Sequence, residues 1–199
     1  MTTTRFFFYG SMVEGLVHFK LVQAFVQNLS KAQLKGSAYR LKVGYPVVLE
    51  QGSDLISGQL AEVKATDLLL GLLDEFHGVN HNDPEKGLHY RKLSQVINEA
   101  GQVEEAWVYL LNPKKLPNTA TLIERGAWEE AMQSQPPLTQ QLTERQVSYI
   151  QRLGKSSGRE IVPIDLALYR ELMNLELIVD KGRRLALSKN GIEVYRYLG

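Results

Sequence analysis

Three of the four histidines of this 199-residue chain fall in one short stretch, at His77, His81 and His89. An imidazole titrates near neutral pH, so it can accept or donate a proton in catalysis, and it is also a common metal ligand. Carboxylates share the stretch: they are Asp74, Glu75, Asp83 and Glu85. Acid–base chemistry and metal binding are therefore the two chemistries to weigh here.

Metal binding has the weaker support. His77 and His81 have the i, i+4 spacing that one face of a helix would bring together, but Gly78 and Asn80 between them favour a turn. The chain has no cysteine, which excludes thiolate metal sites, disulfides and a cysteine nucleophile. We therefore expect residues 78–87 to form a solvated polar loop, with no metal site and no cofactor.

The overall composition is that of a globular protein. Lys and Arg number 23 against 22 Asp and Glu, a net charge of +1, which points to no polyanionic partner. The apolar run Phe6–Tyr9 is far shorter than the ~7–15 residues of a signal-peptide core or the ~20 of a membrane span. We expect a cytoplasmic protein with no membrane partner.

Several elements must position these polar residues. Residues 5–9 form a short apolar segment that predicts a strand, ended by the turn pair Gly10-Ser11. Residues 13–29 carry apolar side chains at helical spacing and predict a helix. Residues 36–63 are rich in strand formers, and residues 67–76 predict a short helix that ends just before His77.

Two further strands are expected at residues 90–99 and 104–111, joined by the turn Ala100-Gly101. The order strand, helix, several strands, helix, hairpin contains no regular βαβ repeat. The fold class predicted is α+β with a mainly antiparallel sheet.

Short motifs follow one another along residues 5–130. They read Phe8-Tyr9-Gly10-Ser11-Met12, Gly44-Tyr45-Pro46, Gly58-Gln59-Leu60-Ala61-Glu62-Val63, Leu73-Asp74-Glu75-Phe76-His77-Gly78, Asp83-Pro84-Glu85, Tyr90-Arg91, Ala106-Trp107-Val108-Tyr109 and Gly126-Ala127-Trp128. In this order and spacing they resemble the γ-glutamylcyclotransferase-like (AIG2-like) family.

The resemblance implies a small mixed, mainly antiparallel β-barrel flanked by helices, with a pocket at one end. In this family the α-amine of a γ-glutamyl group attacks its own γ-carbonyl, which releases 5-oxoproline and a free amine without a metal or cofactor. One carboxylate carries the proton between the two amines. The residues that would bind the substrate are Tyr9, Gly10, Ser11, Met12, Tyr45 and Tyr90.

The chain departs from the family at the catalytic position. The family motif Leu-Asp-x-x-Glu-Gly reads Leu73-Asp74-Glu75-Phe76-His77-Gly78 here, so His77 stands where the resemblance places the catalytic Glu. We expect a domain that binds a small γ-glutamyl-type ligand, with cyclotransferase activity weak or lost. The alternative is an active γ-glutamylamine or γ-glutamyl-peptide cyclotransferase that uses His77 or Glu85 as acid and base.

The C-terminal part changes character after the Pro-rich segment 134–137. We expect one domain at residues 1–133 and an appendage at 138–199. Residues 175–191 resemble the helix, wing hairpin and following helix of winged-helix proteins, which leaves open a regulator with a DNA-binding tail. The local charge excess is small, so nucleic acid is not the expected partner. Packing on the first domain, or a homodimer, is the favoured role.

Overall fold

The computed structural model describes residues 3–64, 67–156 and 160–198. The chain divides into two units. Unit 1 comprises residues 1–41 and 45–135, and unit 2 comprises residues 42–44 and 136–199. Each unit has its own buried residues, and we describe them one after the other.

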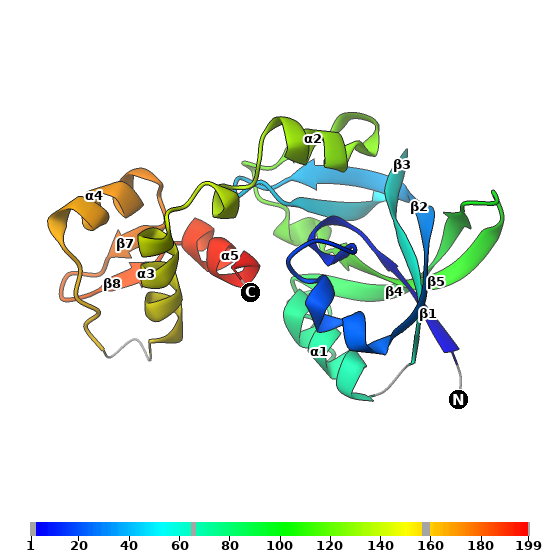
Figure 1. The fold of residues 1–199 in the computed structure, drawn as a ribbon, viewed down its shortest axis with the longest axis horizontal. Coiled ribbons are helices and arrows are strands. Elements are labelled where there is room, and N and C mark those ends of the chain that lie inside the picture. The colour runs from blue at the N-terminus through cyan, green and yellow to red at the C-terminus, as the bar shows by residue number, and fades with distance from the viewer. Residues whose placement is uncertain (1–2, 65–66, 157–159, 199) are drawn as a thin grey trace. The chain divides into compact units, whose positions relative to one another are not determined.

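Unit 1 is built on a closed mixed barrel of five strands (Figure 1). The strands are β1 (Thr3–Phe8), β2 (Val26–Arg40), β3 (Pro46–Lys64), β4 (His89–Asn98) and β5 (Val103–Leu111). They lie in the order β3-β1-β5-β4-β2, and β2 pairs back with β3 to close the barrel. The β1–β5 pair is parallel, and the other pairs are antiparallel. The predicted α+β class and barrel are confirmed.

Alternation along β1 sends neighbouring phenylalanines to opposite sides of the barrel wall. Phe7 belongs to a buried cluster that takes residues from all five strands and therefore fills the barrel, among them Leu34, Ile56, Val96 and Val108. Phe6 and Phe8 belong to a second cluster, which also holds residues of the helix outside the wall. Because β1 is apolar on both faces, it reads in the sequence as an unbroken apolar run.

The helix α1 (Asp67–His77) covers the outer face of this wall (Figure 1). Its fully buried residues are Leu69 and Leu73, which are four positions apart and therefore share one face. The helix ends at Gly78, whose φ of +64° suits a residue without a Cβ. His77 is therefore the last residue of α1, so its backbone position is set by the helix and not by the loop that follows.

The helix predicted over residues 13–29 is wrong. The segment instead forms the 3₁₀ turns Phe19–Leu21 and Gln23–Phe25, after which β2 begins at Val26. The pairing of β2 with β3 accounts for the end of the segment, where Leu29 lies opposite Ala61. Leu21, Phe25 and Leu29 pack, partly buried, against the cluster outside the barrel wall instead of along one helical face. Tertiary pairing overrides the local helical spacing here.

The other elements of unit 1 are short. Strand β6 (Thr121–Leu122) pairs with β2, and helix α2 (Trp128–Ser134) follows it. Trp128 is buried within the cluster that fills the barrel, and its indole Nε1 donates a hydrogen bond of 2.8 Å to the Ser57 carbonyl. Trp128 thus anchors α2 to β3.

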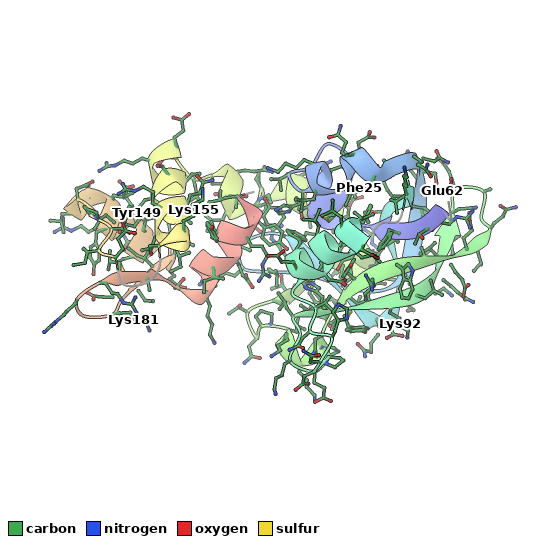
Figure 2. All side chains as sticks on the ribbon, turned by 90° about the horizontal axis from the view of Figure 1, so that it is seen from below. Phe25, Glu62, Lys92, Tyr149, Lys155 and Lys181 are labelled. Atoms are coloured by element: carbon green, nitrogen blue, oxygen red, sulfur yellow. The ribbon has the colours of Figure 1, made fainter. Side chains whose placement is uncertain are left out.

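Unit 2 is a small helical module with one hairpin. Its elements are α3 (Glu144–Lys155), α4 (Leu166–Asn174), β7 (Ile178–Asp180), β8 (Leu185–Leu187) and α5 (Lys189–Tyr197). Side chains of Thr143, Asp165 and Ser188 cap the three helices at their N-termini. Figure 2 shows Tyr149 on α3 and Lys181 at the turn of the hairpin.

None of the helices in the described ranges is long and apolar enough to cross a membrane.

Candidate functional site

The loop that follows β1 holds the predicted ligand-binding residues. Residues Gly10–Met12 form a 3₁₀ turn, and Gly10 takes the left-handed φ of +57°. A Cβ on Gly10 would lie 3.0 Å from Cγ of Pro46, so a side chain there would be crowded as well as strained. A left-handed residue followed by a helical turn directs successive backbone N–H groups to one side, an arrangement that binds anions and carbonyl oxygens.

A buried histidine ties this loop in place. The Nδ1 atom of His18 lies 2.9 Å from Oγ of Ser11, and the backbone N–H of His18 donates to the Ser11 carbonyl at 3.0 Å. Only 2% of His18 and 6% of Ser11 is exposed. Ser11 is therefore held at both its side chain and its backbone by the same residue.

Aromatic contacts lead from His18 to the end of α1. The rings of His18 and Phe76 are 4.4 Å apart, and those of Phe76 and His77 are 4.9 Å apart. Ser11 and His77 are thus joined through His18 and Phe76 in one continuous set of contacts.

His77 is held between two other rings. It stacks on Tyr109 of β5, with ring centroids 4.0 Å apart and planes 9° from parallel. It meets His89 of β4 edge to face at 5.1 Å. Nδ1 of His89 lies 2.7 Å from the His77 carbonyl and must donate to it, which leaves Nε2 as the acceptor of a neutral His89.

Tyr109 is in turn fixed by a carboxylate. Its hydroxyl donates a hydrogen bond of 2.6 Å to Oδ1 of Asp74, which also accepts from Arg91 at 3.1 Å. His81 lies 2.9 Å from the other oxygen, Oδ2. Burial and the hydrogen bond to Asp74 raise the pKa of Tyr109, so the phenol stays neutral. The Asp74 carboxylate therefore serves as a support for the Tyr109 ring that carries His77.

A second connection runs directly from the loop to β5. The hydroxyl of Tyr9 donates a hydrogen bond of 2.9 Å to the carbonyl of Tyr109. Two residues of the loop are thus connected to His77 through different contacts. Ser11 is connected through His18 and Phe76, and Tyr9 is connected through Tyr109.

The other predicted site residues have contacts of their own. Glu85, with 75% of its side chain exposed, forms an ion pair of 2.8 Å with Lys114. The hydroxyl of Tyr90 donates to Glu50 at 3.1 Å, and burial together with this hydrogen bond raises the pKa of Tyr90 to about 12. Tyr45 is buried, one residue before β3 begins.

Sequence reasoning missed the roles of His18, Asp74 and Tyr109. His18 lies in the segment 13–29 for which the spacing predicts a helix, and that helix would not have contained Ser11, so the contact between the two residues could not be predicted. Tyr109 reaches His77 only through the pairing of β4 and β5 with the rest of the barrel. Asp74 could have been singled out from the sequence, because it belongs to the same Leu-Asp motif as His77.

One protein family model matches most of unit 1. The family model "Gamma-glutamyl cyclotransferase, AIG2-like" matches residues 6–130. No curated protein matches the chain. Among solved structures, YkqA from Bacillus subtilis is similar at 21% identity and a TM-score of 0.49, over 68% of this chain and 44% of that one.

Two further solved structures are similar over most of their own length. An AIG2-like protein from Mus musculus shares 17% identity over 59% of this chain and 82% of its own, with a TM-score of 0.43. A protein from Arabidopsis thaliana shares 19% identity over 67% of this chain and 85% of its own, with a TM-score of 0.48. The chain spans less than half the length of the Bacillus protein. Since the family model covers more than half of the present chain, the protein belongs to the AIG2-like gamma-glutamyl cyclotransferase family.

Proposed function

We propose that unit 1 binds a small γ-glutamyl-type ligand at the Tyr9–Met12 loop and has weak or no cyclotransferase activity. The observation that carries this proposal is His77, the last residue of α1, at the position where the family motif has its catalytic Glu.

Ligand binding is supported by the loop itself. Gly10 keeps the left-handed conformation, and its lack of a Cβ leaves room beside Pro46. The tie between Ser11 and His18 holds the loop before any ligand arrives, so little conformational entropy would be lost on binding. The backbone N–H groups of Gly10 and Ser11 are the donors we assign to the ligand's carbonyl or carboxylate oxygen.

Weak or absent turnover follows from the chemistry of an imidazole. A neutral His77 can accept a proton, but it has no negative charge with which to pair the α-ammonium of a γ-glutamyl substrate. That ammonium must approach the base and lose a proton before the nitrogen can attack the γ-carbonyl. Loss of a positioned acid–base group typically costs about 10²–10⁴-fold in rate.

The alternative is an active cyclotransferase in which His77 itself moves the proton. It is favoured by the way Tyr109 and His89 hold the ring, because a general base must be positioned. Glu85 is the weaker candidate for this role, since its carboxylate is exposed and paired with Lys114.

The test is a 5-oxoproline release assay on the full chain with a panel of γ-glutamyl amines and peptides. We expect little or no release by the wild type and a gain by His77→Glu. Ligand binding is measured separately by calorimetry. Robust release by the wild type that survives His77→Ala would overturn the proposal and direct attention to Glu85, for which Glu85→Gln is the next variant.

A further inference from the structure

We infer that the turn Lys42–Gly44 couples the Tyr9–Met12 loop to unit 2, so that a ligand bound at the loop stabilises contacts inside unit 2. The inference rests on the proposed function, because it concerns a ligand of this loop. It goes beyond that function in giving unit 2 a role, which is to respond to the ligand through the turn.

The turn between β2 and β3 belongs to a different unit from the strands that it joins. β2 ends at Arg40 and β3 begins at Pro46, both in unit 1, whereas Lys42–Gly44 belong to unit 2. Only 1% of Val43 is exposed, although turns between strands ordinarily lie at the surface. This turn therefore has packing partners that a simple hairpin turn lacks.

Two contacts within unit 2 hold the turn. The backbone N–H of Leu138 donates a hydrogen bond of 2.9 Å to the Val43 carbonyl. The Lys42 ammonium forms an ion pair with the carboxylate of Glu176, which lies just after α4. Because both of these side chains are exposed, the ion pair contributes little, and the hydrogen bond is the stronger of the two contacts.

The chain runs from this turn to the ligand loop within two residues. Tyr45 comes first, and its carbonyl accepts a hydrogen bond of 2.9 Å from the backbone N–H of Leu41. Pro46 comes next, and the three atoms nearest to the position of a Cβ on Gly10 all belong to it. Since the ring of Pro46 fixes φ, few backbone angles separate the turn from the loop. A displacement of the turn is therefore passed to Pro46.

Pro46 thus connects the state of the turn to the state of the loop. Gly10 holds its left-handed conformation against Pro46, and a released turn would let Pro46 withdraw and the loop relax. Opening of the loop and release of the turn then form one cooperative event. A ligand that binds only the closed loop suppresses this event by a factor of one plus the ratio of its concentration to Kd. By reciprocity, a change in unit 2 that loosens the turn opposes ligand binding.

The first experiment needs no ligand. Hydrogen–deuterium exchange of the full chain is followed by nuclear magnetic resonance at the amides of Met12 and Val13, which donate hydrogen bonds to the carbonyls of Tyr9 and Gly10. These two amides report opening of the ligand loop. Loosening the turn inside unit 2 should make them exchange faster.

Leu138→Pro loosens the turn by removing the N–H that bonds to Val43. Leu138 begins a 3₁₀ turn, and Pro137 before it already has the extended ψ of 150° that a following proline requires. We expect the Met12 and Val13 amides to exchange about three- to tenfold faster, as for the loss of one hydrogen bond.

Leu138→Ala is the matched control. It removes the same leucine side chain but keeps the N–H that donates to Val43. Exchange at Met12 and Val13 should stay within about twofold of the wild type. If Leu138→Pro leaves this exchange unchanged, or accelerates it no more than Leu138→Ala, the inference is wrong.

A charge exchange tests the turn if Leu138→Pro fails to fold. Lys42→Glu places two carboxylates together and should accelerate exchange at the loop amides by about two- to fivefold. Adding Glu176→Lys restores an ion pair of opposite orientation and should return exchange to the wild-type rate. Acceleration that is absent, or that Glu176→Lys does not reverse, contradicts the inference.

A second experiment adds L-γ-glutamylethylamide to the wild type, with its Kd measured by calorimetry. At ten times Kd, exchange of the Leu138 amide in unit 2 should slow by about tenfold. If the compound binds and slows only the loop amides, the inference is wrong while the proposed ligand site stands. If the compound does not bind, the proposed function is wrong for this ligand, and the exchange rates of the ligand-free variants still decide the inference.

Discussion

The imidazole of His77 lies flat on the ring of Tyr109, with centroids 4.0 Å apart, and the Tyr109 hydroxyl is bonded to Asp74 three residues before His77. Helix α1 thus supplies both His77 and the carboxylate that holds the Tyr109 ring on which His77 stacks. A substitution at Tyr109 should therefore change both the free energy of unfolding and the orientation of the His77 ring.

Tyr109→Phe keeps the stacking ring and removes the hydroxyl. The Asp74 oxygen then loses one hydrogen bond but keeps Arg91, so we expect a loss of about 1–2 kcal/mol in the free energy of unfolding. Urea denaturation followed by circular dichroism measures it. Tyr109→Leu, which also removes the ring under His77, should cost more and should weaken ligand binding. Equal effects of the two variants on binding would contradict the role given to the stack.

Gly10→Ala tests the ligand loop. The substitution forces a residue with a Cβ into a left-handed conformation, at about 1–2 kcal/mol, and places the Cβ 3.0 Å from Pro46. We expect ligand binding to fall at least tenfold in calorimetry. Gly15→Ala is the matched control, because Gly15 has a φ of +85° but no atom within 4 Å of its Cβ position. A control as damaging to binding as Gly10→Ala would show that backbone strain alone explains the effect.

Ser11→Ala and His18→Gln test the tie that holds the loop. Both groups are buried, so losing the hydrogen bond between the Ser11 hydroxyl and Nδ1 of His18 should cost about 1–3 kcal/mol of stability. The double variant should cost less than the sum of the two single variants, because they remove the same bond. Thermal unfolding of the wild type, the two single variants and the double variant gives the coupling free energy of this double-mutant cycle. Strict additivity would mean that the bond contributes nothing.

Tyr90 should make the stability of the fold depend on pH in the alkaline range. Burial, followed by the hydrogen bond to Glu50, raises its pKa from 10 to about 12. The unfolded chain therefore loses this proton at lower pH than the folded chain, so its contribution to stability is present below pH 10 and is lost as the pH rises through about 12. Tyrosinate absorbance should show a late-titrating group that Tyr90→Phe removes. An unchanged titration curve in Tyr90→Phe would contradict the assignment.

Leu172→Ala addresses the core of unit 2. Leu172 on α4 is fully buried, and its truncation should lower the free energy of unfolding by about 2–5 kcal/mol. Leu166→Ala is the matched control on the same helix, since 61% of Leu166 is exposed. Chemical denaturation of the full chain is the measurement. If the control loses as much stability as Leu172→Ala, the helix buries a different face from the one described.

The predictable parts of this protein are those encoded locally. Helix α1 could be predicted because Leu69 and Leu73 repeat at helical spacing. The role of His77 stays a prediction, based on the motif residues that flank it. The segment after the loop could not, since the partner strand that draws Val26–Leu29 into β2 lies more than thirty residues further on. For the same reason, the contacts that hold His77 could not be predicted from the sequence. Tyr109 contacts His77 because β5 pairs with β1 and β4, and no local sequence pattern predicts this pairing.

The hydrogen bond from Tyr9 to Tyr109 spans a sequence separation of 100 residues. Closing so long a stretch of chain costs entropy before any contact is gained, and folding rates fall as contacts become less local. The loop and the ring that supports His77 can meet only once β5 has paired in parallel with β1. A ligand that needs both the loop and this ring would therefore bind the closed barrel and no form in which β1 and β5 are unpaired, and its binding would stabilise that pairing.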